Sequence, residues 1–177
     1  MSADAASIER LIRQVPDYPK PGILFYDLTP VVADPDGLAT CVDLLTDAAG
    51  DLDADVVLGI EARGFMLGGA LAKALRVGFV LARKPGKLPW ECVRAEYDLE
   101  YGTDGIELHR DAVAPGMRVL VHDDLLATGG TAHAAIRLVE ALGGLVAGVL
   151  VVVELDGLGA RERLSGHEVR SLVSLPA

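Results

Sequence analysis

Short runs of valine and leucine alternate with helix-like segments through most of the chain. The expected strands cover residues 56–60, 77–82, 119–122 and 145–154, and the expected helices cover residues 64–75 and 130–142. These strands lack the polar–apolar alternation that one solvated face produces, so both of their faces should be covered, as in a parallel sheet. We therefore predict an α/β fold with a central, mostly parallel sheet and helices on both faces. Residues 1–177 should form a single domain.

Two segments depart from this alternation. Near the N-terminus, residues 5–15 carry apolar side chains at helical spacing, residues 16–22 are rich in proline, and a brief apolar run follows. A helix is expected over residues 35–49, because Asp34 is a good cap and proline takes the first helical position. Residues 94–110 have their own turn at Gly102 and Thr103, which predicts an antiparallel hairpin attached to the sheet.

Composition excludes several classes of protein. The formal net charge of −10 disfavours nucleic-acid binding, because such binding depends largely on neutralising phosphates. The longest aliphatic stretch, residues 145–155, is too short to span a bilayer, and the first residues carry no apolar signal segment. Two distant cysteines and four scattered histidines give no metal-binding spacing. We expect a cytoplasmic protein with reduced thiols that binds neither nucleic acid nor membrane.

Positive charge is concentrated in one stretch of this acidic chain. Residues 76–94 contain five basic residues and a single acid, Glu91. A local excess of this kind suits the attraction of a small anion. It also suits a solvated loop, and the charge pattern alone leaves both interpretations open.

The turn after residues 119–122 is the most informative part of the chain. Two adjacent acids, Asp123 and Asp124, follow an apolar strand, and the sequence Thr-Gly-Gly-Thr at residues 128–131 then opens a helix. The glycines allow close approach of the backbone to a ligand, and a helix N-terminus with flanking hydroxyls suits a phosphate. Ionised carboxylates only accept hydrogen bonds, so the two acids suit a pair of ribose hydroxyls. The alternative is an ordinary strand–turn–helix connection; the loop is neither a Walker A motif nor G-x-G-x-x-G.

This segment resembles the phosphoribosyl-pyrophosphate signature of the type I phosphoribosyltransferases. Four more stretches, residues 19–30, 59–65, 83–89 and 99–103, narrow the resemblance to the adenine phosphoribosyltransferase family. The similarity extends over about residues 6–165. It implies the type I phosphoribosyltransferase fold, with a small N-terminal hood that binds the base (residues 1–34) and a mobile catalytic flap (residues 85–110).

The resemblance also implies a role for each matching residue. The ribose and 5-phosphate would be bound by Asp123, Asp124, Ala127, Thr128, Gly129, Gly130 and Thr131. Pyrophosphate would be bound by Arg63, Arg83, Lys84 and Lys87, near a Glu61–Ala62 peptide that is expected to be cis. Adenine would be bound by Leu24, Phe25, Tyr26 and Leu125, with Phe25 and Leu125 on its two sides. On the flap, Glu100 would be the proton donor, with Tyr101 beside it.

The reaction implied is the joining of adenine to 5-phosphoribosyl-1-pyrophosphate (PRPP), which gives AMP and pyrophosphate through a transition state resembling an oxocarbenium ion. Magnesium is expected on PRPP and water, with no protein ligand assigned, and a homodimer is expected. Two positions depart from the family: Tyr26 replaces a frequent arginine, and His122 replaces an aliphatic residue. The alternatives are transfer to hypoxanthine, guanine or xanthine, or a regulator that senses PRPP without turnover.

Overall fold

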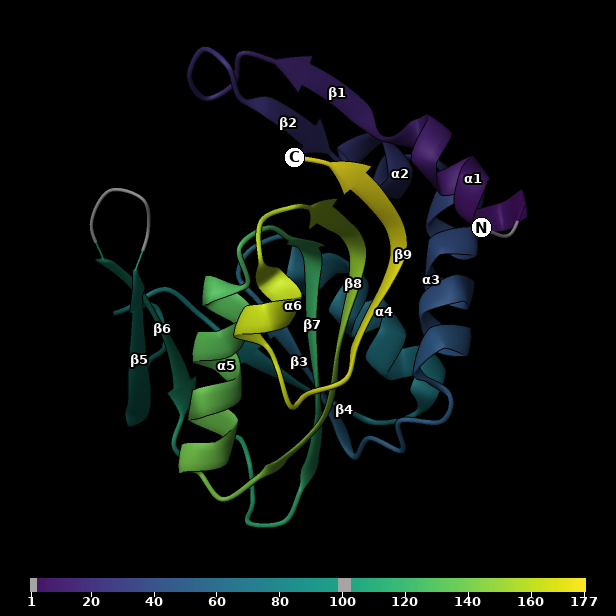
Figure 1. Cartoon of the computed structure of the whole chain (residues 1–177). Helices are drawn as coiled ribbons and strands as arrows, with labels where there is room; N and C mark the ends of the chain where they lie inside the picture. The colour runs from purple at the N-terminus through teal and green to yellow at the C-terminus, as the bar shows by residue number, and fades with distance from the viewer. Residues whose placement is uncertain (1–2, 99–102) are drawn as a thin grey trace.

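The computed structural model describes residues 3–98 and 103–177, and Figure 1 shows its arrangement. The helices are α1 (Ala3–Leu11), α2 (Thr29–Ala33), α3 (Pro35–Ala49), α4 (Gly64–Leu75), α5 (Gly130–Ala141) and α6 (Ala160–Arg163). The strands are β1 (Arg13–Pro16), β2 (Leu24–Asp27), β3 (Val56–Ile60), β4 (Gly78–Ala82), β5 (Cys92–Asp98), β6 (Thr103–His109), β7 (Arg118–Leu126), β8 (Leu145–Asp156) and β9 (Val169–Pro176).

Five of these strands form the central sheet. Their order is β4-β3-β7-β8-β9, and every neighbouring pair is parallel. All five residues of β3 are buried, as are most residues of β7 and β8. This confirms the predicted parallel α/β architecture, and the burial explains why the apolar runs show no polar alternation.

Each face of the sheet has its own apolar core. On one face, Val121 and Val151 pack with residues of α5, such as Ile136. On the other face, Leu120 and Leu150 pack with residues of α1, α3 and α4. Figure 1 shows α5 on one side of the strands and α3 and α4 on the other. The covering of both faces by helices is therefore confirmed.

The N-terminal hairpin differs from the prediction. The helix expected over residues 5–15 ends at Leu11, and β1 begins at Arg13. Val15, which fits the helical pattern, instead pairs with Phe25 in an antiparallel register between β1 and β2. Pairing with a strand that lies beyond the proline-rich turn therefore outweighs the local helical spacing. Figure 1 shows this hairpin lying across the carboxyl ends of the parallel strands.

Helix α3 forms as the sequence predicted. It begins at Pro35, and the Asp34 side chain accepts a hydrogen bond of 2.7 Å from the Gly37 backbone N–H. This bond satisfies one of the donors that the first helical turn leaves free. Proline at the first position loses nothing, because its nitrogen needs no partner there.

The predicted antiparallel excursion is the hairpin of β5 and β6. It is separate from the central sheet, and Arg83 joins it through an isolated bridge to Glu107. Ala95, Ile106 and Leu108 are buried in the same core as α5. The base of this hairpin is therefore packed against the domain. The boundaries given above for the hood and the flap stay predictions.

Strand β7 is longer than residues 119–122, because it continues to Leu126. Asp123 pairs with Val151 and Leu125 pairs with Val153 in the register of β7 and β8. The two acids therefore lie in the strand itself, where successive side chains point to opposite faces.

Among the described residues, no helix is both long and apolar enough to cross a membrane.

His122 is fully buried within β7. Its Nδ1 lies 2.8 Å from the Leu150 carbonyl oxygen, so this nitrogen carries the proton and donates. A Cβ atom added at Gly68 would lie 3.2 Å from the imidazole Cδ2, which shows how closely α4 packs on the ring. Burial lowers the pKa of His122 from its ordinary 6.5 to about 4. The ring is a neutral, packed core group.

We predict that the free energy of unfolding of His122→Leu falls less steeply with decreasing pH than that of the wild type. In the wild type, the unfolded chain takes up a proton on His122 below pH 6.5, whereas the folded chain does so only near pH 4. Folding stability due to this group is therefore lost as the pH falls through that window, by up to about 3 kcal/mol. Urea unfolding of both proteins at pH 7.5 and pH 4.5 measures the difference. Parallel curves for the two proteins would contradict a neutral buried ring.

Candidate active site

The carboxyl end of β7 brings one acid and the Thr-Gly-Gly-Thr turn to a single cavity. Asp123 lines a cavity of about 100 Å³ together with the phosphate loop, which we define as residues 127–131. Leu125 and Ile60 also line it. A cavity of this size is smaller than the roughly 300–1,000 Å³ of a complete ligand site, so it suits one group of a larger ligand.

The phosphate loop has the backbone geometry of an anion site. Gly129 has φ +77° and precedes the first residue of α5, and no side chain caps that helix. Gly129 and Gly130 are buried while Thr128 is exposed. The start of α5, with its free N–H groups and partial positive charge, lines the cavity. This arrangement suits a phosphate group.

Arg63 lies between the second acid and an aromatic ring. Its Nε is 2.7 Å from Asp124 Oδ2, and its Cζ is 5.2 Å from the centre of the Phe25 ring. A Cβ atom at Gly64 would lie 3.0 Å from Asp123 Oδ1, so only glycine lets the start of α4 approach β7 this closely. The β3–α4 turn thus places Arg63 against the acid pair.

Asp124 is buried and Asp123 is half-buried, and this raises the pKa of both carboxyl groups. Burial, with the neighbouring Asp124 charge, raises the pKa of Asp123 well above its usual range. Burial also raises the pKa of Asp124, and the Arg63 charge opposes that rise. Asp124 Oδ2 is a buried acceptor that has no aligned hydrogen-bond donor among the described residues, although Arg63 lies beside it. An oxygen in this position can accept a hydrogen bond from a ligand hydroxyl.

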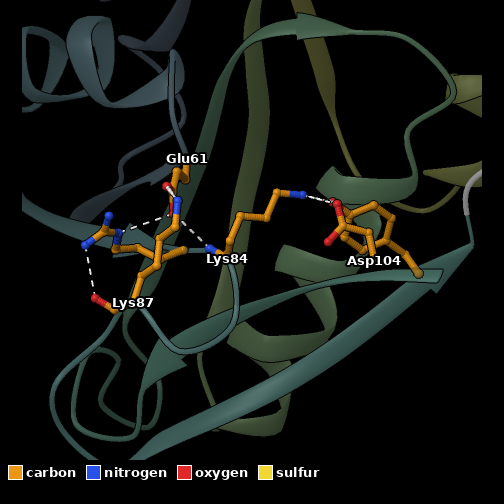
Figure 2. Close-up of polar contacts among 6 residues, drawn as sticks. Glu61, Lys84, Lys87 and Asp104 are labelled. Atoms are coloured by element: carbon orange, nitrogen blue, oxygen red, sulfur yellow. Dashed lines mark hydrogen bonds and ion pairs between the residues drawn. The ribbon is translucent and has the colours of Figure 1, made fainter.

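Three of the predicted anion-binding residues gather around Glu61. Its Oε2 accepts hydrogen bonds from Arg83 Nε at 3.3 Å and from the Lys84 backbone N–H at 2.9 Å. Its Oε1 accepts one from Lys87 Nζ at 2.5 Å, as Figure 2 shows. Burial alone would raise the pKa of Glu61, but these donors lower it to about 2. The Glu61–Ala62 peptide is cis, as the resemblance predicted.

The side chain of Lys84 points away from Glu61, toward the turn end of the β5–β6 hairpin. Its ammonium contacts Asp104 and donates to the Tyr97 hydroxyl at 2.8 Å (Figure 2). The Tyr97 hydroxyl donates in turn to Asp104 Oδ2 at 3.1 Å. Burial alone would lower the pKa of Lys84, but these two partners raise it. Lys84 therefore joins the β3–β4 side of the site to β5 and β6.

The predicted base-binding residues divide between two places. Phe25 lines an open pocket of about 360 Å³ together with Tyr18 and Arg63, and the Tyr18 ring meets it edge-on at 5.1 Å. Leu125 lines the phosphate-loop cavity instead. The structure therefore does not bring Phe25 and Leu125 into one cavity.

Tyr26 points away from this pocket. Its side chain is 2% exposed, and its hydroxyl donates a hydrogen bond of 2.9 Å to the Pro176 carbonyl oxygen at the end of β9. Leu24 lies on the same side of β2, half-buried in the same core. The backbone of these two residues, and not their side chains, is thus what β2 can offer to a ligand.

Comparison with known proteins agrees with this geometry. Residues 35–173 match the family described as the phosphoribosyl transferase domain. The adenine phosphoribosyltransferase of Solibacter usitatus is 58% identical over 166 residues, which are 94% of this chain and 96% of that relative. The chain belongs to the adenine phosphoribosyltransferase family. It is therefore an enzyme of the pentosyltransferase class with the type I phosphoribosyltransferase fold, as its motifs predicted.

Solved structures of this family have the same fold. The enzyme of Thermoanaerobacter pseudethanolicus aligns with a TM-score of 0.95 at 47% identity, covering 97% of this chain and 99% of that one. The enzyme of Saccharomyces cerevisiae, in complex with adenine and D-2,5-dideoxy-2,5-imino-altritol 1,6-bisphosphate, aligns with a TM-score of 0.92 at 39% identity. That alignment covers 98% of this chain and 100% of the yeast chain.

The sequence analysis missed several residues of the site. Glu61, Tyr97 and Asp104 hold the predicted basic residues, yet only Glu61 lies in a motif that drew attention. A signal for Glu61 existed, because an acid two positions before Arg63 interrupts a basic site. Glu100 and Tyr101 lie outside the described residues.

We predict that Glu61→Gln destabilises the protein at neutral pH and much less in acid. The wild-type carboxylate, with a folded pKa of about 2, gains stability above its unfolded pKa and loses it as the pH falls toward 2. Loss of charge-assisted hydrogen bonds should lower the free energy of unfolding by about 1–3 kcal/mol at pH 7. Denaturant unfolding at pH 7 and pH 3 measures this. An equal deficit at both values would show that the charge of Glu61 contributes nothing.

Proposed function

We propose that this chain transfers the phosphoribosyl group of PRPP to adenine in purine salvage, releasing AMP and pyrophosphate. The observation that carries the proposal is the cavity that Asp123 shares with the phosphate loop. Asp124, the next residue of β7, pairs with Arg63. In this space Asp123 would accept hydrogen bonds from sugar hydroxyls and the phosphate loop would bind an anion.

In this proposal the phosphate loop binds the 5-phosphate and the acid pair binds the ribose hydroxyls. The backbone N–H groups of Gly129 and Gly130 and the hydroxyls of Thr128 and Thr131 are the donors. The acids accept hydrogen bonds best when they are ionised, and the Arg63 charge favours the ionised form of Asp124. The burial that raises their pKa also strengthens each hydrogen bond to a bound hydroxyl, because the local dielectric constant is low.

Pyrophosphate would be bound by Arg63, Arg83, Lys84 and Lys87. Each of these side chains already contacts a carboxylate: Asp124, Glu61 or Asp104. A pyrophosphate with several negative charges competes with these carboxylates for the same cations. The acids thus hold the cations in position before the substrate arrives, which lowers the cost of organising the site when it binds.

The adenine ring would stack on Phe25, with backbone groups near Leu24 and Tyr26 reading its amino edge. Leu125 is proposed for its other side, which requires a ring that reaches from the Phe25 pocket to the phosphate-loop cavity. Arg63 now covers a face of Phe25, so a base that stacks on that face must displace the guanidinium. Pyrophosphate gives Arg63 another partner. The departure at Tyr26 is compatible with adenine, because this side chain is turned into the core.

Magnesium is the expected metal. It prefers oxygen ligands and often keeps its waters while it rests on substrate phosphates. The described residues hold no group of three or more histidine, cysteine, aspartate or glutamate side chains placed for an ion. We therefore propose that PRPP and water supply most of its ligands. The ion would neutralise negative charge on the leaving pyrophosphate.

The flap would complete the site. A ribosyl group with oxocarbenium character reacts readily with water, so a cover over the substrates protects the transfer. Glu100 is proposed as the proton donor to the base, with Tyr101 beside it. We also propose a homodimer, from the family resemblance, and a cytoplasmic location, from the composition.

A base panel tests the reaction. We expect the protein, with magnesium and PRPP, to convert adenine to AMP, and to give far less IMP, GMP or XMP from hypoxanthine, guanine or xanthine. Separation of the nucleotides by chromatography measures all four products in one experiment. A preference for another purine would change the assigned base but not the phosphoribosyl transfer itself. PRPP binding without any nucleotide product would favour the regulator.

We predict that Glu100→Gln lowers kcat by about 10²-fold or more while the KM values for adenine and PRPP change only a few-fold, because a general acid acts in the transition state. Steady-state kinetics with both substrates varied gives these constants. Glu96→Gln is the matched control: Glu96 is an exposed acid of the same hairpin, paired with Arg94 at 3.1 Å. Turnover in Glu100→Gln that equals turnover in the control would remove Glu100 from the mechanism.

A further inference from the structure

A buried carboxylate lies beside the phosphate loop but takes no part in the machinery proposed above. Glu154 is 7% exposed and pairs with Leu126 in the register of β7 and β8. Leu126 directly precedes the phosphate loop. Because burying a charge is unfavourable unless it is paired and hydrogen-bonded, Glu154 calls for an explanation.

Every hydrogen bond of this carboxylate leads to α6 or β9. Glu154 Oε1 accepts from Arg161 Nε at 2.8 Å, and Oε2 accepts from Arg161 Nη2 at 2.6 Å. Oε2 also accepts from Ser171 Oγ at 2.9 Å. The remaining guanidinium nitrogen, Nη1, donates to the Val169 carbonyl oxygen at 3.1 Å. Arg161 therefore ties the short helix α6 to both β8 and β9, with the two-pronged geometry that fixes orientation most strongly.

Helix α6 is packed directly behind the phosphate loop. A Cβ atom at Gly129 would lie 3.3 Å from both the Cα and the carbonyl oxygen of Ala160, the first residue of α6. Ala160 is 4% exposed and Leu164, just after the helix, is fully buried. Gly129, at φ +77°, therefore has α6 backbone in the direction that a side chain would take. A shift of α6 removes the surface against which the loop rests.

We propose that Glu154, Arg161 and Ser171 form a brace that positions the phosphate loop for the 5-phosphate of PRPP. They are positioning residues, since they act through Ala160 and Gly129 and do not touch the substrate. The inference rests on the proposed role of residues 127–131 as the 5-phosphate site. Anion binding by backbone N–H groups depends on their direction, so small displacements weaken it.

The brace should affect one part of the substrate and not another. Ribose 5-phosphate carries the 5-phosphate, whereas pyrophosphate does not. We expect Arg161→Met to raise the dissociation constant of ribose 5-phosphate and the KM for PRPP by about tenfold, the lower range for loss of a supporting contact. The dissociation constant of pyrophosphate and kcat should stay within about twofold, a spread typical of distant sites. Arg161→Lys, which keeps the charge but not the fork, should fall between.

Arg170→Met is the matched control. Arg170 also belongs to an ion-pair network on β9, with Asp51 and Glu168 as its partners, but it lies at the amino end of that strand. Its loss should lower thermal stability without any selective effect on ribose 5-phosphate. A merely structural role for Arg161 would give the same pattern as this control.

Isothermal titration calorimetry with ribose 5-phosphate and with pyrophosphate, together with steady-state kinetics, tests the proposal on the whole protein. Equal weakening of both ligands in Arg161→Met, or no weakening in either Arg161→Met or Arg161→Lys, overturns it. Thr131→Val tests the loop separately. If Thr131→Val weakens ribose 5-phosphate and the Arg161 variants do not, only the brace fails. If ribose 5-phosphate binds the wild type but Thr131→Val leaves its affinity unchanged, the loop assignment fails and the brace fails with it.

Discussion

The contact between Arg63 and Asp124 is the constraint on which the rest of the site depends. Two adjacent carboxylates, one buried and one half-buried, lie near the end of β7, and such a pair tends to take up protons, because burial and mutual repulsion both disfavour the charged forms. A protonated acid is a poorer acceptor for ribose hydroxyls. The guanidinium of Arg63, 2.7 Å from Asp124, counters that tendency. The same side chain also touches Phe25, so one cation links the subsites proposed for ribose, pyrophosphate and base.

Charge pairing extends this principle to the remaining cations. Glu61 holds Arg83 and Lys87, and Asp104 holds Lys84. These carboxylates reduce the free energy gained when an anion binds, because the anion must replace a carboxylate as the partner of each cation. They also fix long, flexible side chains near the positions they would take with pyrophosphate. Lys84 has a further consequence, because its partners Tyr97 and Asp104 belong to the flap hairpin. Replacement of Asp104 by pyrophosphate as the partner of Lys84 would therefore change a contact of the hairpin that is expected to close.

The sequence was informative wherever the controlling interactions are local. Runs of valine and leucine predicted the parallel strands, and Asp34 with Pro35 predicted the start of α3. Predictions failed where a distant partner decides the outcome. Val15 leaves its helical pattern because it pairs with Phe25, and β7 runs through Asp123 because β8 continues beside it. The roles of Asp104 and Glu154 depend on partners that no spacing rule indicates. The roles assigned to the site residues rest on the family resemblance, and the structure shows which of them lie together.

Tyr26 shows how a change at a motif position can leave a binding surface intact. Alternation along β2 turns Phe25 toward the open pocket and Tyr26 into the core. A two-stranded hairpin is marginally stable by itself, so β1 and β2 need anchors on the domain. The Tyr26 hydroxyl provides one by donating to the Pro176 carbonyl oxygen, and burial raises the pKa of this hydroxyl, which keeps it a neutral donor. A different side chain with a different anchoring contact can therefore occupy this position, provided that the position of the backbone beside Phe25 is unchanged.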